Sequence, residues 1–464
     1  MTVTATTSGA PPQVVEQPQS EEPSDNDEAS PVVAGQGFAY TEVRRNFFGH
    51  NFVRPLTSGG VRQSVLALTS TAIGGGLLTL PYAMRLTGMG LGCLLLLVGG
   101  LMSAYSIQVL MTKTVETGAM QYGELVGKKM RGCGTAFNVL LSAYGFGVQV
   151  AYFNFVGDFL SSLGEVLFPS VPLLHSREFI IFAILPIVVP LSVPRSLSSL
   201  KYVSIVGAIA LAYTSALIIA RAPGKVTKDI IAELKVCVID WNFFIALGNF
   251  VFAYNCHLNV CPVASELEVA TGPRISKVSY TAIFVQIFFY MCIAVSGYLS
   301  FGEGAKSDIL ANYAVDDPSA IIARFALAAT LLFALPINLN PTLRAFLAVG
   351  DSLRKKGARR SQGENGLLER PRTKLHDNWV ARLLSAMLYT IGAATTACAV
   401  SDPSEVIGLT SAAIGTLMMF ILPGFFAGDF RLPVIGLFVL GFLNGSGAIV
   451  MILQAFGVLP KAPA

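Results

Sequence analysis

The sequence predicts an all-α polytopic membrane protein with about eleven transmembrane helices. Of its 464 residues, 53% are hydrophobic and only 13% are charged, whereas soluble domains carry about 25% charged residues. Apolar runs of about 20 residues recur along the chain, and each is long enough to cross a hydrocarbon core of ~30 Å. The lipid bilayer is therefore the first partner that the sequence predicts.

Residues 1–45 differ in composition from the rest of the chain. The first 40 residues contain six acidic residues among Pro, Ser, Thr and Gly, and the first basic residue is Arg44. Such a composition is typical of disordered segments. Because no basic region precedes an apolar core here, we expect no cleavable signal, and the segment from Val61 should act as the first membrane signal. We expect a disordered acidic cytosolic tail.

The apolar runs between polar breaks define one transmembrane domain over 61–456. The predicted spans are 61–84, 89–111, 136–163, 179–193, 203–220, 243–263, 280–299, 321–349, 380–400, 406–426 and 434–456. The fourth span is short and contains Pro186 and Pro190, although membrane helices tolerate Pro better than soluble helices do. A basic cytosolic loop is expected over 350–378.

The distribution of basic residues predicts the orientation. With the amino terminus in the cytosol, 23 of the 32 Lys and Arg residues fall on the cytosolic side, as the positive-inside rule requires. The carboxyl terminus should then be extracellular. No motif addresses the chain to an organelle, so the plasma membrane is the default expectation. The basic residues form no stripe with interleaved aromatics, so no nucleic acid partner is predicted.

Three consecutive glycines interrupt the first span, at Gly74, Gly75 and Gly76. Each costs a helix about 1 kcal/mol relative to Ala, so the run favours an unwound break in mid-membrane. Amides freed at the start of the second half-helix would point into a cavity and could hold a carboxylate. The alternative is that the glycines only allow close helix packing.

The sixth span contains polar residues in an otherwise apolar stretch, namely Asn249, Asn255, His257 and Asn259. Polar groups that face lipid are costly, so these should face protein or a water-filled cavity. Carbonyl groups released by a second break here would suit an ammonium group or a cation. His257 could relay protons, but we favour the alternative of a buried neutral His in structural hydrogen bonds.

The positions of the two interrupted spans predict an inverted repeat. A block of five spans is odd, so a second block of five starts on the opposite side of the membrane. The repeats would be about 61–220 and 243–426, with an extra helix at 434–456. Interrupted helices at matching positions of inverted halves point to a transporter's binding site.

The third and eighth spans add candidate cavity residues. Tyr144, Tyr152 and Asp158 lie in the third span, and Asn338 and Asn340 lie in the eighth. Either tyrosine could instead be a core aromatic, and Asp158 could lie at the membrane interface. A buried carboxylate would favour a cationic substrate or proton coupling.

These motifs resemble the amino acid/auxin permease family. The resemblance rests on residues 73–83 (IGGGLLTLPYA), on 252–260 (FAYNCHLNV) with Glu266 and Leu267, on 297–302 (GYLSFG) with the loop that follows, and on 421–423 (ILP). It covers about 61–456, and the tail and overall length look most like the kinetoplastid branch. The resemblance implies a leucine-transporter-like fold of five-plus-five inverted helices and secondary active uptake of amino acids.

The resemblance also implies where substrate binds. The carboxylate would lie near Gly74–Gly76 and the amine near the carbonyls of residues 250–254. The expected substrate-binding residues are Thr71, Gly74, Gly75, Gly76, Tyr152, Asn249, Phe250, Phe252, Tyr254 and Asn255. Candidate coupling-ion residues are Ser70, His257, Asn338 and Asp158. Sodium-coupled members commonly carry Asn in place of Ser70 and a hydroxyl residue where this chain has Asn338 and Asn340, so H⁺ coupling or facilitated movement is favoured over Na⁺.

Two other functions stay open: a membrane amino acid sensor without transport, and an intracellular exporter in a vacuolar or lysosomal membrane. An enzyme is not expected, because no phosphate-binding loop, metal-ligand cluster or nucleophile motif is present. The seven Cys residues lack the spacing of a zinc or redox site. No metal or cofactor is therefore predicted, and the sequence leaves open whether the substrate is cationic or neutral.

Overall fold

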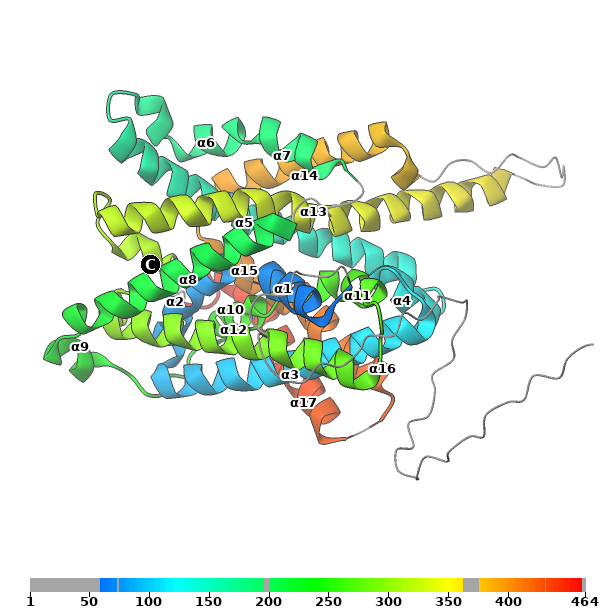
Figure 1. The fold of residues 1–464 in the computed structure, drawn as a ribbon, viewed down its shortest axis with the longest axis horizontal. Coiled ribbons are helices and arrows are strands. Elements are labelled where there is room, and N and C mark those ends of the chain that lie inside the picture. Colours follow the sequence, from blue (N-terminus) through cyan, green and yellow to red (C-terminus); the bar gives the residue numbers. More distant parts are fainter. Residues whose placement is uncertain (1–58, 73–74, 195–200, 362–374, 430, 461–464) are drawn as a thin grey trace, which may run out of the picture. The chain divides into compact units, whose positions relative to one another are not determined.

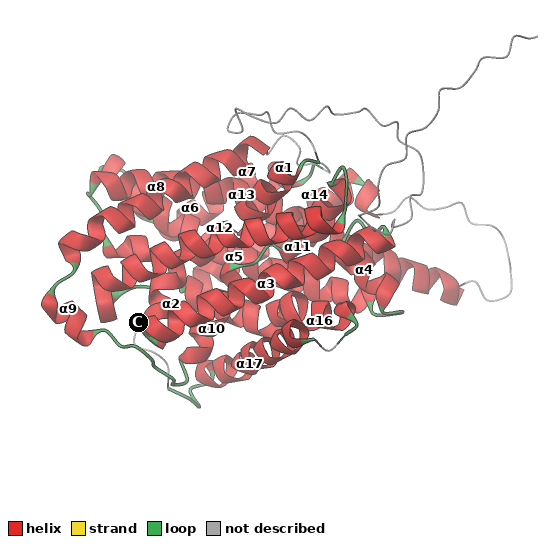
Figure 2. Cartoon of the chain, turned by 60° about the horizontal axis from the view of Figure 1, so that its bottom comes forward, coloured by secondary structure: helices red, strands yellow, loops and turns green. Residues whose placement is uncertain are grey.

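The computed structural model describes residues 59–72, 75–194, 201–361, 375–429 and 431–460. In these segments the regular structure is helical and no strand occurs, which confirms the predicted all-α class (Figure 1). Figure 2 shows the same helices joined mostly by short connections. The predicted tail over 1–45 and the candidate residue Gly74 lie outside the described residues.

The first half of the chain forms helices α1 to α9. Their bounds are α1 (Val61–Ala72), α2 (Leu80–Thr87), α3 (Met89–Thr117), α4 (Tyr122–Lys129), α5 (Gly134–Leu167), α6 (Arg177–Ala183), α7 (Leu185–Ser192), α8 (Lys201–Lys225) and α9 (Lys228–Glu233). Short 3₁₀ helices are η1 (Gly75–Thr79), directly before α2, and η2 (Pro172–His175).

The second half forms helices α10 to α17. Their bounds are α10 (Phe243–Ala253), α11 (His257–Glu266), α12 (Gly272–Phe301), α13 (Pro318–Ser361), α14 (Trp379–Ala399), α15 (Pro403–Thr410), α16 (Leu422–Ala427) and α17 (Leu432–Ala455). The 3₁₀ helices η4 (Gly302–Gly304), η5 (Ile309–Asn312) and η6 (Leu375–Asp377) lie in the loops, and the π-helical turns η7 (Ser411–Gly415) and η8 (Leu417–Ile421) join α15 to α16.

Seven described helices are long and apolar enough to cross a membrane, and counting two bent pairs as spans gives up to nine. One bent pair is α1 with residues 76–87, at 54°, and the other is 403–415 with 417–427, at 41°. The α6–α7 pair and α8 occupy the predicted fourth and fifth spans. The chain is a multi-pass membrane protein. The number eleven and the inverted repeat stay predictions.

The centre of the bundle is built around α5 and α10. Helix α5 packs along α13 and also contacts α14 and α15, while α10 contacts α2, α15 and α17. Glycine allows close approach of two of these backbones, because a Cβ on Gly248 of α10 would lie 2.8 Å from the carbonyl oxygen of Gly408 in α15. Large apolar side chains such as Leu388 and Phe442 are exposed on the outer helices, as expected of surfaces that face lipid.

Two features differ from the sequence prediction. Helix α13 continues to Ser361, so the first part of the predicted loop over 350–378 is helical. The tenth span, predicted over 406–426, bends at two π-helical turns, which the sequence did not indicate. Neighbouring helices supply partners to this stretch, since the Tyr122 hydroxyl donates to the carbonyl oxygen of Met418 at 2.7 Å and the Asn444 amide donates to Thr416 Oγ1 at 2.9 Å.

Candidate functional site

The two interrupted spans meet in the middle of the bundle. Helix α10 ends at Ala253 and α11 begins at His257, so the predicted interruption of the sixth span is present. In the first span, residues 73–74 lie outside the described part, and η1 follows directly. A Cβ on Gly76 of η1 would lie 2.9 Å from Phe252 Cδ1 and 3.2 Å from the Cα of Ala253. A side chain at position 76 would therefore be in tight contact with both Phe252 and the backbone of the sixth span.

Tyr144 of α5 completes this group. Its ring centroid lies 6.4 Å from that of Phe252, and a Cβ on Gly415 of η7 would lie 3.2 Å from its Cε2 atom. The side chain is 0% exposed, yet its hydroxyl has no hydrogen-bond partner among the described residues. A buried hydroxyl without a partner is costly, so this position is suited to a ligand or an ordered water.

A second polar atom without a partner lies in the break of the sixth span. Asn255 Oδ1 is buried and accepts no hydrogen bond in the part of the chain that the structure describes. Its neighbour Cys256 lies near enough to the Tyr144 hydroxyl to interact with it electrostatically, as does Tyr152. Of the expected substrate residues, Phe252 and Tyr152 lie near Tyr144, and Gly76 lies against Phe252.

Other expected substrate residues make contacts between helices instead. The Tyr254 hydroxyl donates to the carbonyl oxygen of Leu96 in α3 at 2.9 Å, and its ring packs on Tyr290 of α12. The Asn249 amide donates to Ser404 Oγ of α15 at 2.8 Å, and the Phe250 ring lies beside Gly92 of α3. Their side chains thus fix the position of α10, and a contact with substrate would have to come from its backbone.

Thr71 and Ser70, at the end of α1, turn back on their own helix. The Thr71 hydroxyl donates to the carbonyl oxygen of Ala67 at 2.5 Å, and the Ser70 hydroxyl donates to the same oxygen at 3.1 Å. Asn338 does the same in α13, because its amide donates to the carbonyl oxygen of Ala334 at 3.1 Å. In each of these bonds the side chain of Thr71, Ser70 or Asn338 donates to a backbone carbonyl of its own helix.

His257 links three elements of the bundle. Its Nε2 atom lies 3.1 Å from Ser106 Oγ of α3, and that hydroxyl also lies 2.5 Å from the carbonyl oxygen of Met419 in η8. Because a hydroxyl has one proton and a carbonyl only accepts, Ser106 donates to Met419 and His257 donates through Nε2–H. The Nδ1 atom then carries a lone pair and has no partner among the described residues. This arrangement fits the structural, neutral His.

Asp158 lies near the carboxyl end of α5 in an ion pair. Arg177 of α6 donates through Nε to Asp158 Oδ1 at 2.5 Å, and the same guanidinium donates to Asn154 Oδ1 and to the carbonyl oxygen of Ala397. The carboxylate is therefore neutralised in this conformation, and the guanidinium joins α5, α6 and α14. No group of three or more His, Cys, Asp or Glu within the described segments could hold a metal ion.

Comparison with known proteins identifies the family. The sequence pattern described as "Transmembrane amino acid transporter protein" matches residues 57–430, which contain both interrupted spans and Tyr144. This chain belongs to that transporter family. The expected resemblance to amino acid permeases is confirmed at the level of the family, whereas the kinetoplastid branch stays a prediction.

Several proteins with names of amino acid transporters are similar to the chain. A Toxoplasma gondii protein named "Putative amino acid transporter AAT1" is 31% identical over 67% of this chain and 44% of its own length. "Vacuolar amino acid transporter 6" of Saccharomyces cerevisiae is 29% identical over 61% of this chain and 64% of its own length. "Sodium-coupled neutral amino acid transporter 7" of Xenopus laevis is 26% identical over 78% of this chain and 79% of its own. The match thus spans less than half of the Toxoplasma protein.

Proposed function

We propose that this protein is a secondary active transporter that imports amino acids by alternating access. The observation that carries the proposal is the meeting of η1 with the break of the sixth span beside the unpartnered Tyr144 hydroxyl. Membership of the transporter family supports it. Interrupted helices at mid-membrane are how transporters present backbone groups to a small substrate.

The zwitterionic part of an amino acid suits this arrangement. Its carboxylate would accept hydrogen bonds from amides of Gly75 and Gly76, at the positive end of the η1–α2 segment, and from the Tyr144 hydroxyl. Its ammonium group would lie at carbonyl oxygens of the sixth-span break. Phe252 would pack against the substrate, since its ring is in contact with Gly76 and lies near Tyr144.

We propose that transport is either coupled to protons or facilitated without a coupling ion. The polar groups of Ser70 and Asn338, two positions that differ from sodium-coupled members, hydrogen-bond their own helices. A relative named as sodium-coupled belongs to the same family, so the coupling ion must be measured. The proposed location is the plasma membrane with a cytosolic amino terminus and an extracellular carboxyl terminus.

An intracellular exporter is the second candidate function, because relatives named as vacuolar transporters match 61–62% of this chain. Fluorescent tagging in the native cell would separate the two locations. A sensor that binds an amino acid without moving it is the third.

Uptake into proteoliposomes tests the proposed function. The purified protein is reconstituted and offered each of the twenty labelled amino acids, with and without a pH gradient, and with and without sodium. Saturable uptake of one class of amino acid that an inward proton gradient accelerates is the expected result. Uptake that requires sodium would contradict the proposed coupling, and binding without uptake would indicate a sensor.

A further inference from the structure

A cavity of about 260 Å³ lies where α5 ends and α15 begins, and of the candidate residues described above it is lined by Asp158 alone. Four parts of the chain line it: the end of α5, the start of α15 with the residues just before it, Arg324 of α13, and the segment 302–317 between α12 and α13, which we call the α12–α13 loop. Helix α5, the residues at the start of α15 and the loop each contribute one carboxylate, from Asp158, Asp402 and Asp308, and α13 contributes the Arg324 guanidinium. In the predicted topology this end faces away from the cytosol.

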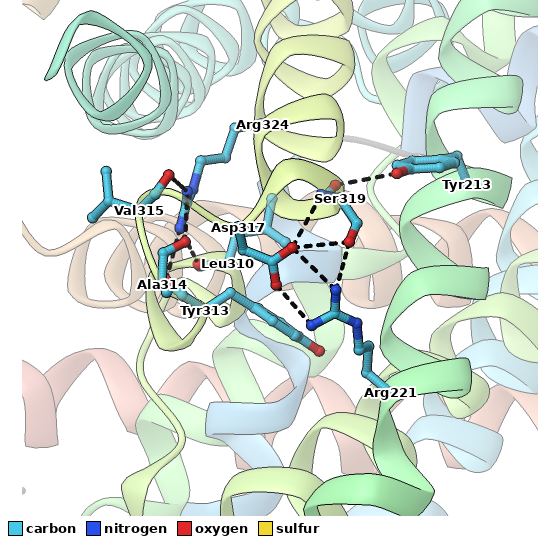
Figure 3. A network of polar contacts seen from close by, with 9 residues as sticks. All are labelled: Tyr213, Arg221, Leu310, Tyr313, Ala314, Val315, Asp317, Ser319 and Arg324. Atoms are coloured by element: carbon cyan, nitrogen blue, oxygen red, sulfur yellow. Dashed lines mark hydrogen bonds and ion pairs between the residues drawn. The ribbon is translucent and has the colours of Figure 1, made fainter. Parts of the chain in front are cut away.

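The α12–α13 loop is held together as one unit. The Arg324 side chain of α13 is 3% exposed, and its guanidinium donates to the carbonyl oxygens of four loop residues at 2.9–3.2 Å, namely Leu310, Tyr313, Ala314 and Val315. Arg221 of α8 reaches the loop from another helix and pairs with Asp317 at 2.7 Å. Figure 3 shows both arginines. Because the Arg324 contacts tie the loop to itself, it would move as a single lid. Opening would have to release its contacts with Arg221 of α8 and with Arg85 of α2, which donates to the carbonyl oxygen of Ala305 at 3.0 Å.

Asp308 is the least exposed of the carboxylates that line this cavity, with an exposed fraction of 7%. Among the described residues it accepts one hydrogen bond, from the backbone N–H of Leu310 at 3.0 Å, and it makes no ion pair. Burial of an ionised carboxylate costs desolvation free energy, and here no directly paired positive charge offsets that cost.

The charged groups around Asp308 do not neutralise it directly. On α5, Asp158 is paired with Arg177 of α6. On α15, Asp402 lines the same cavity, and the Glu405 carboxylate lies near Asp402. The Arg324 guanidinium on α13 points at loop carbonyls, and Lys306 of the loop donates to the carbonyl oxygen of Ala311 at 3.4 Å.

The environment of Asp308 therefore favours its protonated form. Burial, reinforced by the nearby Asp158 carboxylate, raises the pKa of Asp308 from 3.8 to about 7. If the loop lifted and water reached the carboxyl group, this cause would vanish and the pKa would return towards its ordinary value.

We propose that the α12–α13 loop is a proton-operated lid, in which Asp308 takes up a proton when the loop closes on α5 and α15 and releases it when the loop opens. The inference rests on the proposed function in one respect, since a lid of this kind would link proton binding to the transport cycle. The ligand of this device is the proton itself.

The sign of the pH dependence follows from linkage. A carboxyl group whose pKa is higher in the closed state stabilises that state at low pH, and the stabilisation is lost as the pH rises through about 7. With pKa values of about 7 closed and 3.8 open, the ratio of closed to open lid should rise roughly 25-fold between pH 7.5 and pH 5.5.

Hydrogen–deuterium exchange of the full chain in lipid nanodiscs tests the lid without requiring transport. Wild type and Asp308→Asn are compared at pH 5.5 and 7.5 in the peptide that covers residues 303–317, with exchange corrected for its intrinsic pH dependence. Asn keeps an acceptor for the Leu310 N–H but cannot ionise. We expect wild-type protection to fall at least about tenfold on going to pH 7.5, and Asp308→Asn to keep its protection at both pH values.

Asp317→Asn is the matched control. Its hydrogen bonds with Arg221 and Ser319 hold the pKa of Asp317 below its usual value, so this carboxylate is ionised at both pH values. The protection of Asp317→Asn should differ from that of wild type by the same factor at pH 5.5 and at pH 7.5. Wild-type protection that does not depend on pH, or an equal pH dependence in wild type and Asp308→Asn, would overturn the proposal. Uptake is measured in a separate experiment. A protein that does not transport could still show the pH-dependent protection, and a protein without pH-dependent protection could still transport.

Discussion

At the scale of single residues, the candidate site rests on contacts between groups that are distant in the sequence. The glycine run and the polar residues of the sixth span can be recognised from composition alone, because both are unfavourable in a membrane helix. The contact of Gly76 with Phe252 cannot be recognised in this way, because it joins positions far apart in the chain. Tyr144 could be recognised only as a polar residue in an apolar span, and its unpartnered hydroxyl required the structure.

Gly76→Leu should strongly reduce transport. The new side chain would collide with Phe252 and Ala253, and strain of about 1–3 kcal/mol corresponds to a loss of roughly 5–150-fold in uptake. Initial rates of uptake in proteoliposomes measure this. The matched control is Gly224→Leu, because a Cβ there meets nothing within 4 Å. Equal uptake by Gly76→Leu and Gly224→Leu would remove Gly76 from the site.

Tyr144→Phe should weaken substrate binding with little effect on stability. Its hydroxyl has no partner to lose within the described chain, so the variant loses only the bond to substrate, about 1 kcal/mol or roughly fivefold in Kd. Tyr254→Phe is the contrasting variant, since its hydroxyl donates to Leu96. That variant should lose about 1 kcal/mol of stability instead. Equilibrium binding and thermal unfolding separate the two effects, and a lowered Tm for Tyr144→Phe with unchanged Kd would contradict the assignment.

At the scale of helices, the interruption of the sixth span was predictable and the bend of the tenth was not. The sixth span breaks among polar residues that a lipid-facing helix would not contain. The tenth span bends at π-helical turns whose sequence, residues 411–421, is mostly apolar. These turns are stabilised from outside by Tyr122, Ser106 and Asn444. Because π-helical turns often occur at functional sites, the bend beside Tyr144 belongs to the candidate site.

Tyr122→Phe tests the role of that bend. The Met418 carbonyl would lose its buried donor, which should cost about 1–3 kcal/mol and lower the Tm. If the bend also moves during transport, the maximal rate of uptake should fall while substrate affinity stays near wild type. A variant with wild-type Tm and uptake would show that the bend is independent of this hydrogen bond.

At the scale of the whole molecule, composition and periodicity were sufficient for the fold class, because a bilayer admits few architectures. Span boundaries were less predictable. Helix α13 continues past the apolar run into the basic segment and ends at Ser361, since Lys and Arg are good helix formers outside the membrane. The sequence did not single out Arg324 and Arg221, which attach the α12–α13 loop, because their roles depend on contacts that only the structure shows.

The pH dependence of uptake belongs to this scale. If the lid closes on protonation, uptake in proteoliposomes should increase as the pH on the lid side falls through about 7. Asp308→Asn should flatten this profile without changing which amino acid is carried. An unchanged profile in Asp308→Asn would place the proton-binding group elsewhere in the chain.

Counterflow tests the central claim most directly. Proteoliposomes are preloaded with an unlabelled amino acid, diluted into a trace of the same labelled amino acid, and followed with no ion gradient present. An alternating-access transporter should accumulate label transiently above equilibrium, and Gly76→Leu should not. Label that binds to the protein without entering the vesicle lumen would contradict transport and identify a sensor.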